Sequence, residues 1–496
     1  MPSIDPQDQR LAELASLLEK ASARIEVLDK RVDELAAENR KLKAENKKLR
    51  AQLGQNSTNS SKPPSSDPPW KKPKPKGKKG KRKRGGQPGH KKHTRELVPI
   101  EESDEVVVVK PESCSCCGGP LHGDDPSPHR HQVVELPQVV PLVTEYQQHS
   151  LGCDACGAVT TEPLPEGVPT RAFGPSVDAT VSLLTGVYRL SKRMVCSLMA
   201  DLYSLPISTG SVVACERSAS EALAAPVDEA HAFAQQQELK FADETSWRED
   251  GKKIWLWTVV TQLVTVFVLH ARRNTDAAKQ LLGKAVGILH TDRHGAYNWW
   301  PTVLRQLCWA HLTRDLRAIS ERGGESERIG NALLDEEKRM FHWWHRVRDG
   351  TLARSTFIVY MRPLRKRVEE LLTEGAALLP EKGSPPSEDP DDSELKTGRT
   401  CGKILKHKEA LWTFVRVEGV EPTNNTAEQA VRYAVLWRNI CFGTQSSGGS
   451  RFVERILTVH ATLRQQKRNV LAFIRQACEA SLHRQPPPSL LPERKD

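Results

Sequence analysis

Apolar residues recur every seven positions through the first 53 residues of the chain. One heptad series consists of Leu11, Leu18, Ile25, Val32 and Leu53, and the other of Leu14, Leu28, Leu35, Leu42 and Leu49. This pattern predicts a coiled coil of about six heptads. Asn39 and Asn46 interrupt the first series, and Ala21 interrupts the second. Because Asn at such positions favours a parallel, in-register pair, the pattern predicts a homodimer.

Two other interpretations of the heptad segment fit less well. A basic leucine zipper also joins a coiled coil to a cationic stretch, but its basic helix runs into the zipper from the N-terminal side. Here the cationic stretch follows the heptads and is broken by prolines. The second alternative is a lone amphipathic helix packed on the body of the protein. The polar segment 52–66 would tether such a helix only loosely.

Two acidic residues follow strand-like apolar patterns. Asp243 leaves a short apolar stretch that precedes β-rich runs at residues 254–261 and 264–270. Asp292 ends the apolar run 286–291, and a Gly-Ala-Tyr sequence after it starts a new element. The pattern predicts Asp243 on or at the end of one strand and Asp292 at the carboxyl end of another. Open sheets place ligand sites at such strand ends.

A third acidic residue, Glu428, lies where a helix is expected to begin. Asn424 or Asn425 is the expected N-cap, and Glu428 follows about one turn later. Arg432 lies four residues further on, so the two side chains share one face of the helix. The chain thus presents an Asp, Asp, Glu set on a sheet and an adjoining helix.

Residues 175–224 are expected to form three short helices. Ser191 and either Thr209 or Ser211 suit the N-cap positions, and a Leu-Pro pair before Thr209 forces a turn. A helix-turn-helix DNA-binding module has this pattern, and so does any small helical bundle. In the first case, the candidates for DNA contact are Lys192, Arg193 and Arg217.

Three carboxylates that converge suit a metal-dependent reaction at phosphodiester bonds. Two Mg²⁺ ions about 4 Å apart, or Mn²⁺, bind hard oxygen ligands and act on both the attacking and the leaving oxygen. Bound dications also remove the mutual repulsion of the carboxylates. Each acidic residue taken alone is more simply a surface charge. The sequence around the three residues favours a metal site over three surface charges.

Several sequence blocks carry a resemblance to a known family. They are Ala242-Asp-Glu-Thr245, Cys308-Trp-Ala-His311, Asn424-Asn-Thr-Ala-Glu428, and Phe442-Gly-Thr-Gln-Ser446 followed by Arg451-Phe-Val-Glu-Arg-Ile456. Over nearly its whole length the chain resembles transposases of the insertion sequence 66 family. The resemblance implies an RNase H-like catalytic fold of the DDE type, without a covalent protein–DNA intermediate. It implies that the metal-binding carboxylates are Asp243, Asp292 and Glu428.

The 135 residues between Asp292 and Glu428 are too many for one loop. The family resemblance implies a mostly helical insertion there. Helix-spaced apolar residues agree with it at 312–319, 329–347 and 357–372. The Pro-rich, acidic stretch 380–392 is expected to be a linker inside the insertion.

The positive charge of the chain is concentrated in one segment. Of 73 Lys and Arg residues, ten lie between residues 71 and 84, and the other 63 nearly balance the 62 acidic residues. The ten are Lys71, Lys72, Lys74, Lys76, Lys78, Lys79, Lys81, Arg82, Lys83 and Arg84. Interleaved Pro and Gly predict an extended tether that binds DNA phosphates without sequence specificity. A solubilising linker and a nuclear-localisation signal share this composition, but the resemblance points to bacteria.

The eleven cysteines do not form a disulfide framework, since a reducing compartment is expected. Most are isolated and are interpreted as small core residues. Four form two C-x-x-C pairs, each followed by Gly, and these are Cys114, Cys117, Cys153 and Cys156. Two such pairs favour a structural zinc ion over redox chemistry, although the 35-residue spacer is long for a zinc ribbon. A strand-like stretch at 133–146 would return the chain to the first pair, and Cys116 is an alternative ligand.

Two further residues are accessory candidates. His311 follows an expected strand at 304–308, where it would assist proton transfer or contact DNA. A capped or core His is the simpler interpretation. Arg432, like the nearby Arg438, would orient the carboxylate or bind a phosphate. For Arg432 a helical salt bridge with Glu428 is an equal alternative.

The chain is therefore expected to be a multidomain α+β or α/β protein. We expect a coiled coil at 1–54, a disordered basic linker at 55–95, a zinc-binding module with four cysteine ligands at 96–171, a helical DNA-binding module at 172–235, the RNase H-like core at 236–312 and 400–480, a helical insertion at 313–399, and a disordered tail at 481–496.

The predicted function is a dimeric DNA transposase that binds transposon ends and target DNA. Helper proteins of the same element are possible further partners, as the family suggests. The alternatives are an inactive DNA-binding regulator of the same fold and an RNase H-like nuclease that does not join strands. Since no signal peptide or apolar span of about 18 residues is found, we expect a cytoplasmic, nucleoid-associated bacterial protein without a membrane partner.

Overall fold

The computed structural model describes residues 6–57, 59–63, 67, 95–380 and 393–492. The described residues form two compact units. The first draws on Met1–Lys72, Pro165–Ser191 and Val213–Asp496, and the second on Pro73–Leu164 and Lys192–Val212. Helices are combined with a mixed sheet, which confirms the α+β character. Within these residues, no helix has both the length and the apolar surface that a membrane crossing requires.

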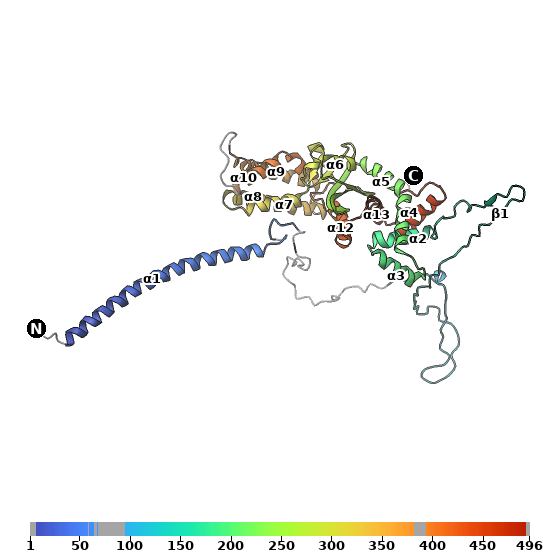
Figure 1. Cartoon of the computed structure of the whole chain (residues 1–496), viewed down its shortest axis with the longest axis horizontal. Helices are drawn as coiled ribbons and strands as arrows, with labels where there is room; N and C mark the ends of the chain where they lie inside the picture. Colours follow the sequence, from blue (N-terminus) through green and yellow to red (C-terminus); the bar gives the residue numbers. More distant parts are fainter. Residues whose placement is uncertain (1–5, 58, 64–66, 68–94, 381–392, 493–496) are drawn as a thin grey trace. The chain divides into compact units, whose positions relative to one another are not determined.

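Helix α1 (Pro6–Leu53) is uninterrupted, as the heptad pattern predicts (Figure 1). Its apolar stripe is exposed, with Leu28 55% and Leu35 43% accessible. The side-chain amides of Asn39 and Asn46 donate to carbonyl oxygens one turn earlier in the same helix, at 3.3 and 3.2 Å. An exposed Leu stripe is what an unpaired coiled-coil strand presents. The pairing of two chains stays a prediction.

Two residues of the linker expected at 55–95 contact the helical layer. Ser60 is buried, and its carbonyl oxygen accepts a hydrogen bond from Nη1 of Arg317 at 3.0 Å. The amide and hydroxyl of Ser61 donate to the Glu321 carboxylate at 2.9 and 2.6 Å. Helix α7 (Trp309–Ser320) and its C-cap thus bind Ser60 and Ser61, and the disorder expected for the linker stays a prediction. The ten basic residues at 71–84 lie outside the described residues.

The second unit contains a two-stranded antiparallel sheet of β1 (Ser150–Gly152) and β2 (Val159–Thr161). This hairpin encloses the second C-x-x-C pair. The strand expected at 133–146 is wrong, since none of these residues is assigned to a strand. Leu142 and Val143 there are almost fully exposed, so these apolar side chains are not packed in a core.

Helices occupy the region where three short ones are expected. They are α2 (Pro175–Ser182), a π-helical turn η3 (Leu183–Val187), α3 (Lys192–Tyr203), α4 (Thr209–Ala222) and α5 (Ala224–Gln235). The cap of α4 differs from the expectation. The hydroxyl of Ser208 accepts the backbone N–H of Ser211 at 3.0 Å, so Ser208 caps the helix in place of Thr209 or Ser211.

A five-stranded sheet forms the centre of the first unit, in the order β5-β4-β3-β6-β7. Its strands are β3 (Leu239–Glu249), β4 (Lys252–Val260), β5 (Thr265–His270), β6 (Ile288–Thr291) and β7 (Arg305–Leu307). Strands β3, β4 and β5 form an antiparallel meander, whereas β6 is parallel to β3 and β7 is parallel to β6. Asp250 and Gly251 both have positive φ and close the β3–β4 hairpin, as an Asp-Gly turn favours.

Different helices cover the two faces and one edge of this sheet. Helix α12 (Asn425–Cys441) covers the first face, where Trp247 and Trp437 pack edge to face. The 3-10 turn η4 (Gly295–Tyr297) covers the second face, where Trp257 meets Tyr297. Helix α6 (Thr275–Leu282) packs against η4 and β4. Helix α13 (Ser447–Gln465) lies along edge strand β5, and its Thr458, Thr462 and Glu454 side chains accept the free N–H groups of that edge.

The segment between Asp292 and Glu428 forms a helical layer with its own core, as expected (Figure 1). It contains α7, α8 (Gly324–Arg348), α9 (Arg354–Ala376), α10 (Ser393–Leu405), the 3-10 turn η6 (Lys408–Leu411) and α11 (Thr413–Arg416). Buried residues of this core continue to Val420, beyond the expected boundary at 399. The linker expected at 380–392 lies, except for Pro380, outside the described residues.

The first part of the C-terminal tail contacts the main core. Helix α14 runs from Val470 to Leu482, and Leu490 beyond it is fully buried in the main core. Side chains of Gln466 and Arg468 donate to the carbonyl oxygen of Leu490 at 2.9 and 3.3 Å. The disorder expected for the tail from residue 481 stays a prediction. A Pro-rich composition did not prevent one Leu from anchoring the segment.

Candidate active site

Asp243 lies in the middle of β3, opposite Thr258 of β4. Its side chain is on the sheet face that α12 covers, because side chains alternate along a strand and Trp247, four residues on, packs against α12. Its Oδ1 accepts the backbone N–H of Glu244 at 2.9 Å. Asp243 is thus on a strand, as the sequence predicts.

Asp292 follows the last residue of β6, at the carboxyl end of a strand that is parallel to β3. Its Oδ1 accepts the backbone N–H of His294 at 2.9 Å, which fixes the carboxylate at the start of the turn. The Arg305 guanidinium donates to the hydroxyl of Thr291 at 3.1 Å and supports the same strand end. The predicted position of Asp292 at the end of a strand is confirmed.

Glu428 lies in the first turn of α12, as predicted. Asn424 occupies the N-cap position, but its side chain does not cap the helix. The buried side-chain amide of Asn424 donates instead to the carbonyl oxygen of Ala242 at 2.8 Å. This bond ties the start of α12 to the strand residue that precedes Asp243, which brings Glu428 to the same region.

The three predicted carboxylates share one electrostatic environment. Burial above all, together with the charges of Glu244, Asp292 and Glu428, raises the pKa of Asp243 to about 8. Asp243, His311 and Glu428 line a cavity of about 560 Å³. Asp292 and His311 line a second cavity of about 660 Å³. His311 therefore lines both of the cavities that the three carboxylates line.

Glu244 is a buried carboxylate that the sequence analysis missed. It is on the opposite face of β3, and its carboxylate is bound by Nε and Nη2 of Arg273 at 2.8 and 2.6 Å and by the hydroxyl of Tyr297. Burial and the charge of Asp292 raise the pKa of Glu244, while Tyr297 and Arg273 lower it. Its only sequence signal is adjacency to Asp243. The alternation of a strand assigns it to the other face.

Cys308, interpreted from sequence as a core residue, is buried but also borders the site. It precedes α7, and its Sγ accepts the backbone N–H of Asn424 at 3.2 Å. Burial raises the pKa of its thiol to about 11. The Cys308 Sγ lies 3.9 Å from Oε1 of Glu428, and the Nδ1 of His311 lies 3.5 Å from the same oxygen. The available signal was the Cys-x-x-His spacing at the start of a helix.

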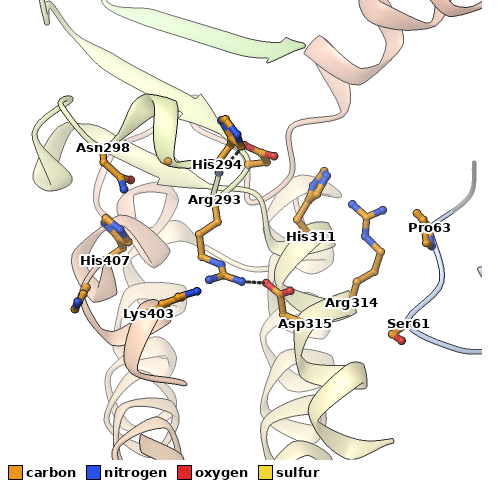
Figure 2. Close-up of a pocket in the computed structure, with 13 residues that line it drawn as sticks. Ser61, Pro63, Arg293, His294, Asn298, His311, Arg314, Asp315, Lys403 and His407 are labelled. Atoms are coloured by element: carbon orange, nitrogen blue, oxygen red, sulfur yellow. Dashed lines mark hydrogen bonds and ion pairs between the residues drawn. The ribbon is translucent and has the colours of Figure 1, made fainter. Parts of the chain in front are cut away.

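Basic side chains surround the cavity beside Asp292. Figure 2 shows Arg293, Arg314, Lys403 and His407 gathered around it, and Lys406 also lines it. Arg293 is paired with Asp315 at 2.7 Å. Lys403 and Lys406 are exposed. Lys403 is in the last turn of α10 and Lys406 directly follows the helix. The helical insertion therefore contributes positive charge to the site.

The remaining candidates lie in different surroundings. Arg432 is exposed, and no ion pair with Glu428 is found among the described residues, so the proposed helical salt bridge is absent there. Arg438 donates to the hydroxyls of Thr245 and Ser246 at 3.0 and 2.8 Å and so joins α12 to β3. Lys192 and Arg193 are exposed in the first turn of α3, in the second unit.

The cysteine pairs form two separate turns of the expected kind. Gly118 and Gly157 after them have φ of 73° and 70°, and their N–H groups bond to the carbonyl oxygens of Cys114 and Cys153 at 2.9 and 2.7 Å. Hydrogen bonds from the backbone of Cys117 and of Ala155, above all, lower the pKa of Cys114 and Cys153 respectively. Among the described residues, the four thiols are not gathered into one cluster. The zinc site stays a prediction.

Comparisons with known proteins identify the family of the chain. Residues 175–451, more than half of the chain, match the family model described as Transposase IS66 family, and this range includes Asp243, Asp292 and Glu428. Residues 3–96 match a family of unknown function (DUF6444). A relative from Sinorhizobium fredii, Uncharacterized protein y4hP, is 25% identical over 420 residues, which cover 75% of this chain and 71% of that protein.

Proposed function

This chain belongs to the IS66 transposase family, and we propose that it cuts and joins DNA with a metal site formed by Asp243, Asp292 and Glu428. The observation that supports this proposal is that three carboxylates far apart in sequence are near enough for the charges of Asp292 and Glu428 to act on Asp243. Asp243 experiences the charges of both other residues, and the Asn424–Ala242 hydrogen bond holds the helix of Glu428 against the strand of Asp243.

The strand order supports an RNase H-like core. An antiparallel meander of β5, β4 and β3 is extended by the parallel strands β6 and β7, with Asp243 on the central strand and Asp292 at the end of its parallel neighbour. The helix with the third carboxylate, α12, packs on the face of β3 that Asp243 occupies. This is the arrangement that the family resemblance implies for a DDE enzyme.

The donor set fits hard divalent ions. Asp243, Asp292 and Glu428 offer only carboxylate oxygens, which Mg²⁺ and Mn²⁺ prefer. Burial first, and then the neighbouring negative charges, raise the pKa of Asp243, and a dication would relieve the repulsion among these charges. When bound, two ions would stabilise the charge that develops on the attacking and leaving oxygens. These observations support the site without fixing the number of ions.

The reaction we propose has two displacements at phosphorus. In the first, water attacks a phosphodiester and the P–O3′ bond breaks, which leaves a 3′-hydroxyl on the element and a 5′-phosphate on the flanking DNA. In the second, that 3′-hydroxyl attacks a target phosphodiester, and a target 3′-oxygen leaves. No protein side chain becomes covalently attached. The chain holds the strand and its proton acceptors in place.

The basic side chains around Asp292 suit the DNA backbone. Arg293, Arg314, Lys403 and Lys406 line one cavity with Asp292, so a strand bound there would have phosphates beside the catalytic carboxylates. We further propose that the cationic tether at 71–84, and Lys192 and Arg193 in the helical module, add contacts to DNA. The tether would contribute affinity without specificity.

Pairing through α1 would place two catalytic cores in one complex. Transposition needs two DNA ends cut and joined together, and the exposed Leu stripe of α1 offers a surface for a second copy. We propose a homodimer for this reason. A structural zinc ion at the four thiolates of Cys114, Cys117, Cys153 and Cys156 is part of the same proposal.

A joining assay tests the proposal directly. Purified protein with Mg²⁺ is incubated with DNA that carries the sequences flanking its gene, and 3′-end nicking and strand joining are measured. We expect joined products from the wild type and none from Asp243→Ala, Asp292→Ala or Glu428→Ala, with DNA binding retained. Asp250→Asn, at an exposed hairpin turn that Asn tolerates, is the matched control and should remain active.

The alternatives predict other products. Nicking without joining in every condition would favour an RNase H-like nuclease. Tight DNA binding with neither product, across Mg²⁺ and Mn²⁺, would favour a DNA-binding regulator. Equal loss of DNA binding in all three carboxylate variants would mean that these residues are structural.

A further inference from the structure

Glu428 is close to a thiol and an imidazole, two metal-binding groups that a Mg²⁺ site does not require. The Sγ of Cys308 and the Nδ1 of His311 lie 3.9 and 3.5 Å from Oε1 of Glu428. One donor atom from each of the three residues lies within 4.8 Å of the other two. Among the described residues, this is the one group of three or more such side chains with that spacing.

Two of the three separations are close to those around one tetrahedral ion. Zinc–ligand bonds of about 2.0–2.3 Å at tetrahedral angles place neighbouring sulfur, nitrogen and oxygen donors roughly 3.4–3.6 Å apart. The observed 3.5 and 3.9 Å need only a small contraction. A thiolate and an imidazole favour zinc-class ions over Mg²⁺, which prefers oxygen donors.

The local structure leaves the His311 donor unused. Its Nδ1 is buried and has no hydrogen-bond partner among the described residues, although a carboxylate oxygen is 3.5 Å away. A buried ring nitrogen without a partner loses free energy, and coordination to a metal ion would recover it. Cys308 and His311 precede and open α7 at a three-residue spacing, which turns both donors toward the start of α12.

We propose that Cys308, His311 and Glu428 bind a zinc-class divalent ion, with a fourth position open toward the cavity that Asp243 lines. Binding replaces the thiol proton of Cys308, which passes to solvent. The ion would engage the carboxylate of Glu428 and so compete with Mg²⁺ for it. The binding of this ion is inferred from the geometry and does not depend on the proposed function. The consequence, reversible inhibition of DNA joining by zinc, rests on the function proposed above.

Cobalt(II) provides a test that needs neither DNA nor activity, because it adopts the zinc geometry and its thiolate complexes absorb light. Spectra of the full-length chain are compared between wild type, Cys308→Ser and His311→Gln. Cys401→Ser and His407→Gln are matched controls, since Cys401 is a buried thiol in the insertion core and His407 lines the Asp292 cavity. Cobalt at the paired cysteines of the second unit is common to all five proteins and cancels in the differences.

We expect the wild type to bind one more cobalt ion per chain than Cys308→Ser, with a thiolate-to-cobalt charge-transfer band in the difference spectrum. His311→Gln should lower the affinity for this ion at least tenfold, and both controls should bind cobalt as the wild type does. Identical wild-type and Cys308→Ser spectra would overturn the proposal. If Cys308→Ser does not fold, alkylation of wild-type thiols decides: zinc should slow the reaction of Cys308 and not that of Cys401.

The joining assay separates this inference from the proposed function. Zinc added to the Mg²⁺ reaction should inhibit joining by the wild type, and a chelator should reverse the inhibition. The zinc concentration that halves the zinc-free joining rate should be at least tenfold higher for Cys308→Ser than for the wild type. A Cys308-dependent cobalt spectrum without joining would contradict the proposed function alone. Joining with Mg²⁺ but no Cys308-dependent spectrum would contradict the zinc-class site alone.

Discussion

The side-chain amide of Asn424 donates to the main-chain carbonyl oxygen of Ala242 at 2.8 Å. This buried bond connects two segments that each carry a candidate metal ligand, Asp243 and Glu428. The backbone N–H of Asn424 also donates to the Cys308 thiol, so one residue joins three parts of the site. The relative position of the carboxylates therefore depends on a side chain that is itself no metal ligand.

Replacement of Asn424 should disturb the metal site more than the fold. Asn424→Asp keeps the shape but removes the amide donor, which leaves the Ala242 carbonyl unsatisfied at a cost of about 1–3 kcal/mol. We expect a lower denaturation midpoint and a weaker affinity for Mg²⁺ or Mn²⁺. Asn425→Asp, one residue on and exposed, is the control. A normal metal affinity in Asn424→Asp would mean that the bond does not position Glu428.

The Arg273–Glu244 pair should contribute measurable stability because its carboxylate is fully buried. Removal of either partner breaks a bidentate contact, so a double-mutant cycle with Glu244→Gln and Arg273→Gln should give a coupling free energy above about 1 kcal/mol. The exposed pair Lys338–Asp335 is the comparison and should give about 0–0.5 kcal/mol. Equal coupling in the two cycles would show that burial does not strengthen the Glu244 pair.

Local patterns in the sequence were enough to predict the main helices and strands and the places of Asp243, Asp292 and Glu428 on them. The heptads give α1, and an acidic residue after an apolar run gives Asp292 at a strand end. Glu244 and Cys308 were missed because their roles come from contacts with Arg273, Tyr297 and Glu428, which are distant in sequence. Local periodicity carries no information about such partners.

Contacts of segments with a polar or Pro-rich composition have the same origin. Residues 55–63 and the tail up to residue 492 have the composition of disordered segments, yet Ser60 and Leu490 are buried. In each case, a surface formed elsewhere supplies the partner: Arg317 for Ser60, and Gln466 with Arg468 for the segment of Leu490. Composition indicates whether a segment can fold by itself. It does not indicate whether another part of the protein binds that segment.

Metal binding should depend on pH through Asp243. Its folded pKa of about 8 is above the ordinary 3.8, so its contribution to the stability of the metal-free protein is full below the ordinary value and is lost as the pH rises through about 8. Mg²⁺ requires the ionised carboxylate and competes with this proton. The rise in melting temperature on addition of Mg²⁺ should therefore be larger above pH 8 than near pH 6.

Asp243→Asn removes both the titration and a ligand, so its melting temperature should respond little to Mg²⁺ at either pH. Asp250→Asn should behave as the wild type. A magnesium effect of the same size at both pH values in the wild type would contradict the assignment of Asp243 as the titrating ligand.

Lys403 and Lys406 should contact the DNA backbone if the insertion helps to hold the strand beside Asp292. Both are exposed, and no carboxylate partner for either is found among the described residues. Each phosphate contact contributes about 0.9 to the slope of the logarithm of the DNA-binding constant against the logarithm of salt concentration. Lys403→Ala/Lys406→Ala should reduce the magnitude of this slope by up to about 2, measured without divalent ions so that no DNA is cut. Lys338→Ala/Lys366→Ala removes the same charge from the outer helices α8 and α9 and should leave the slope unchanged. An equal reduction of the slope in both double variants would mean that total charge, and not the position beside Asp292, determines how this protein binds DNA.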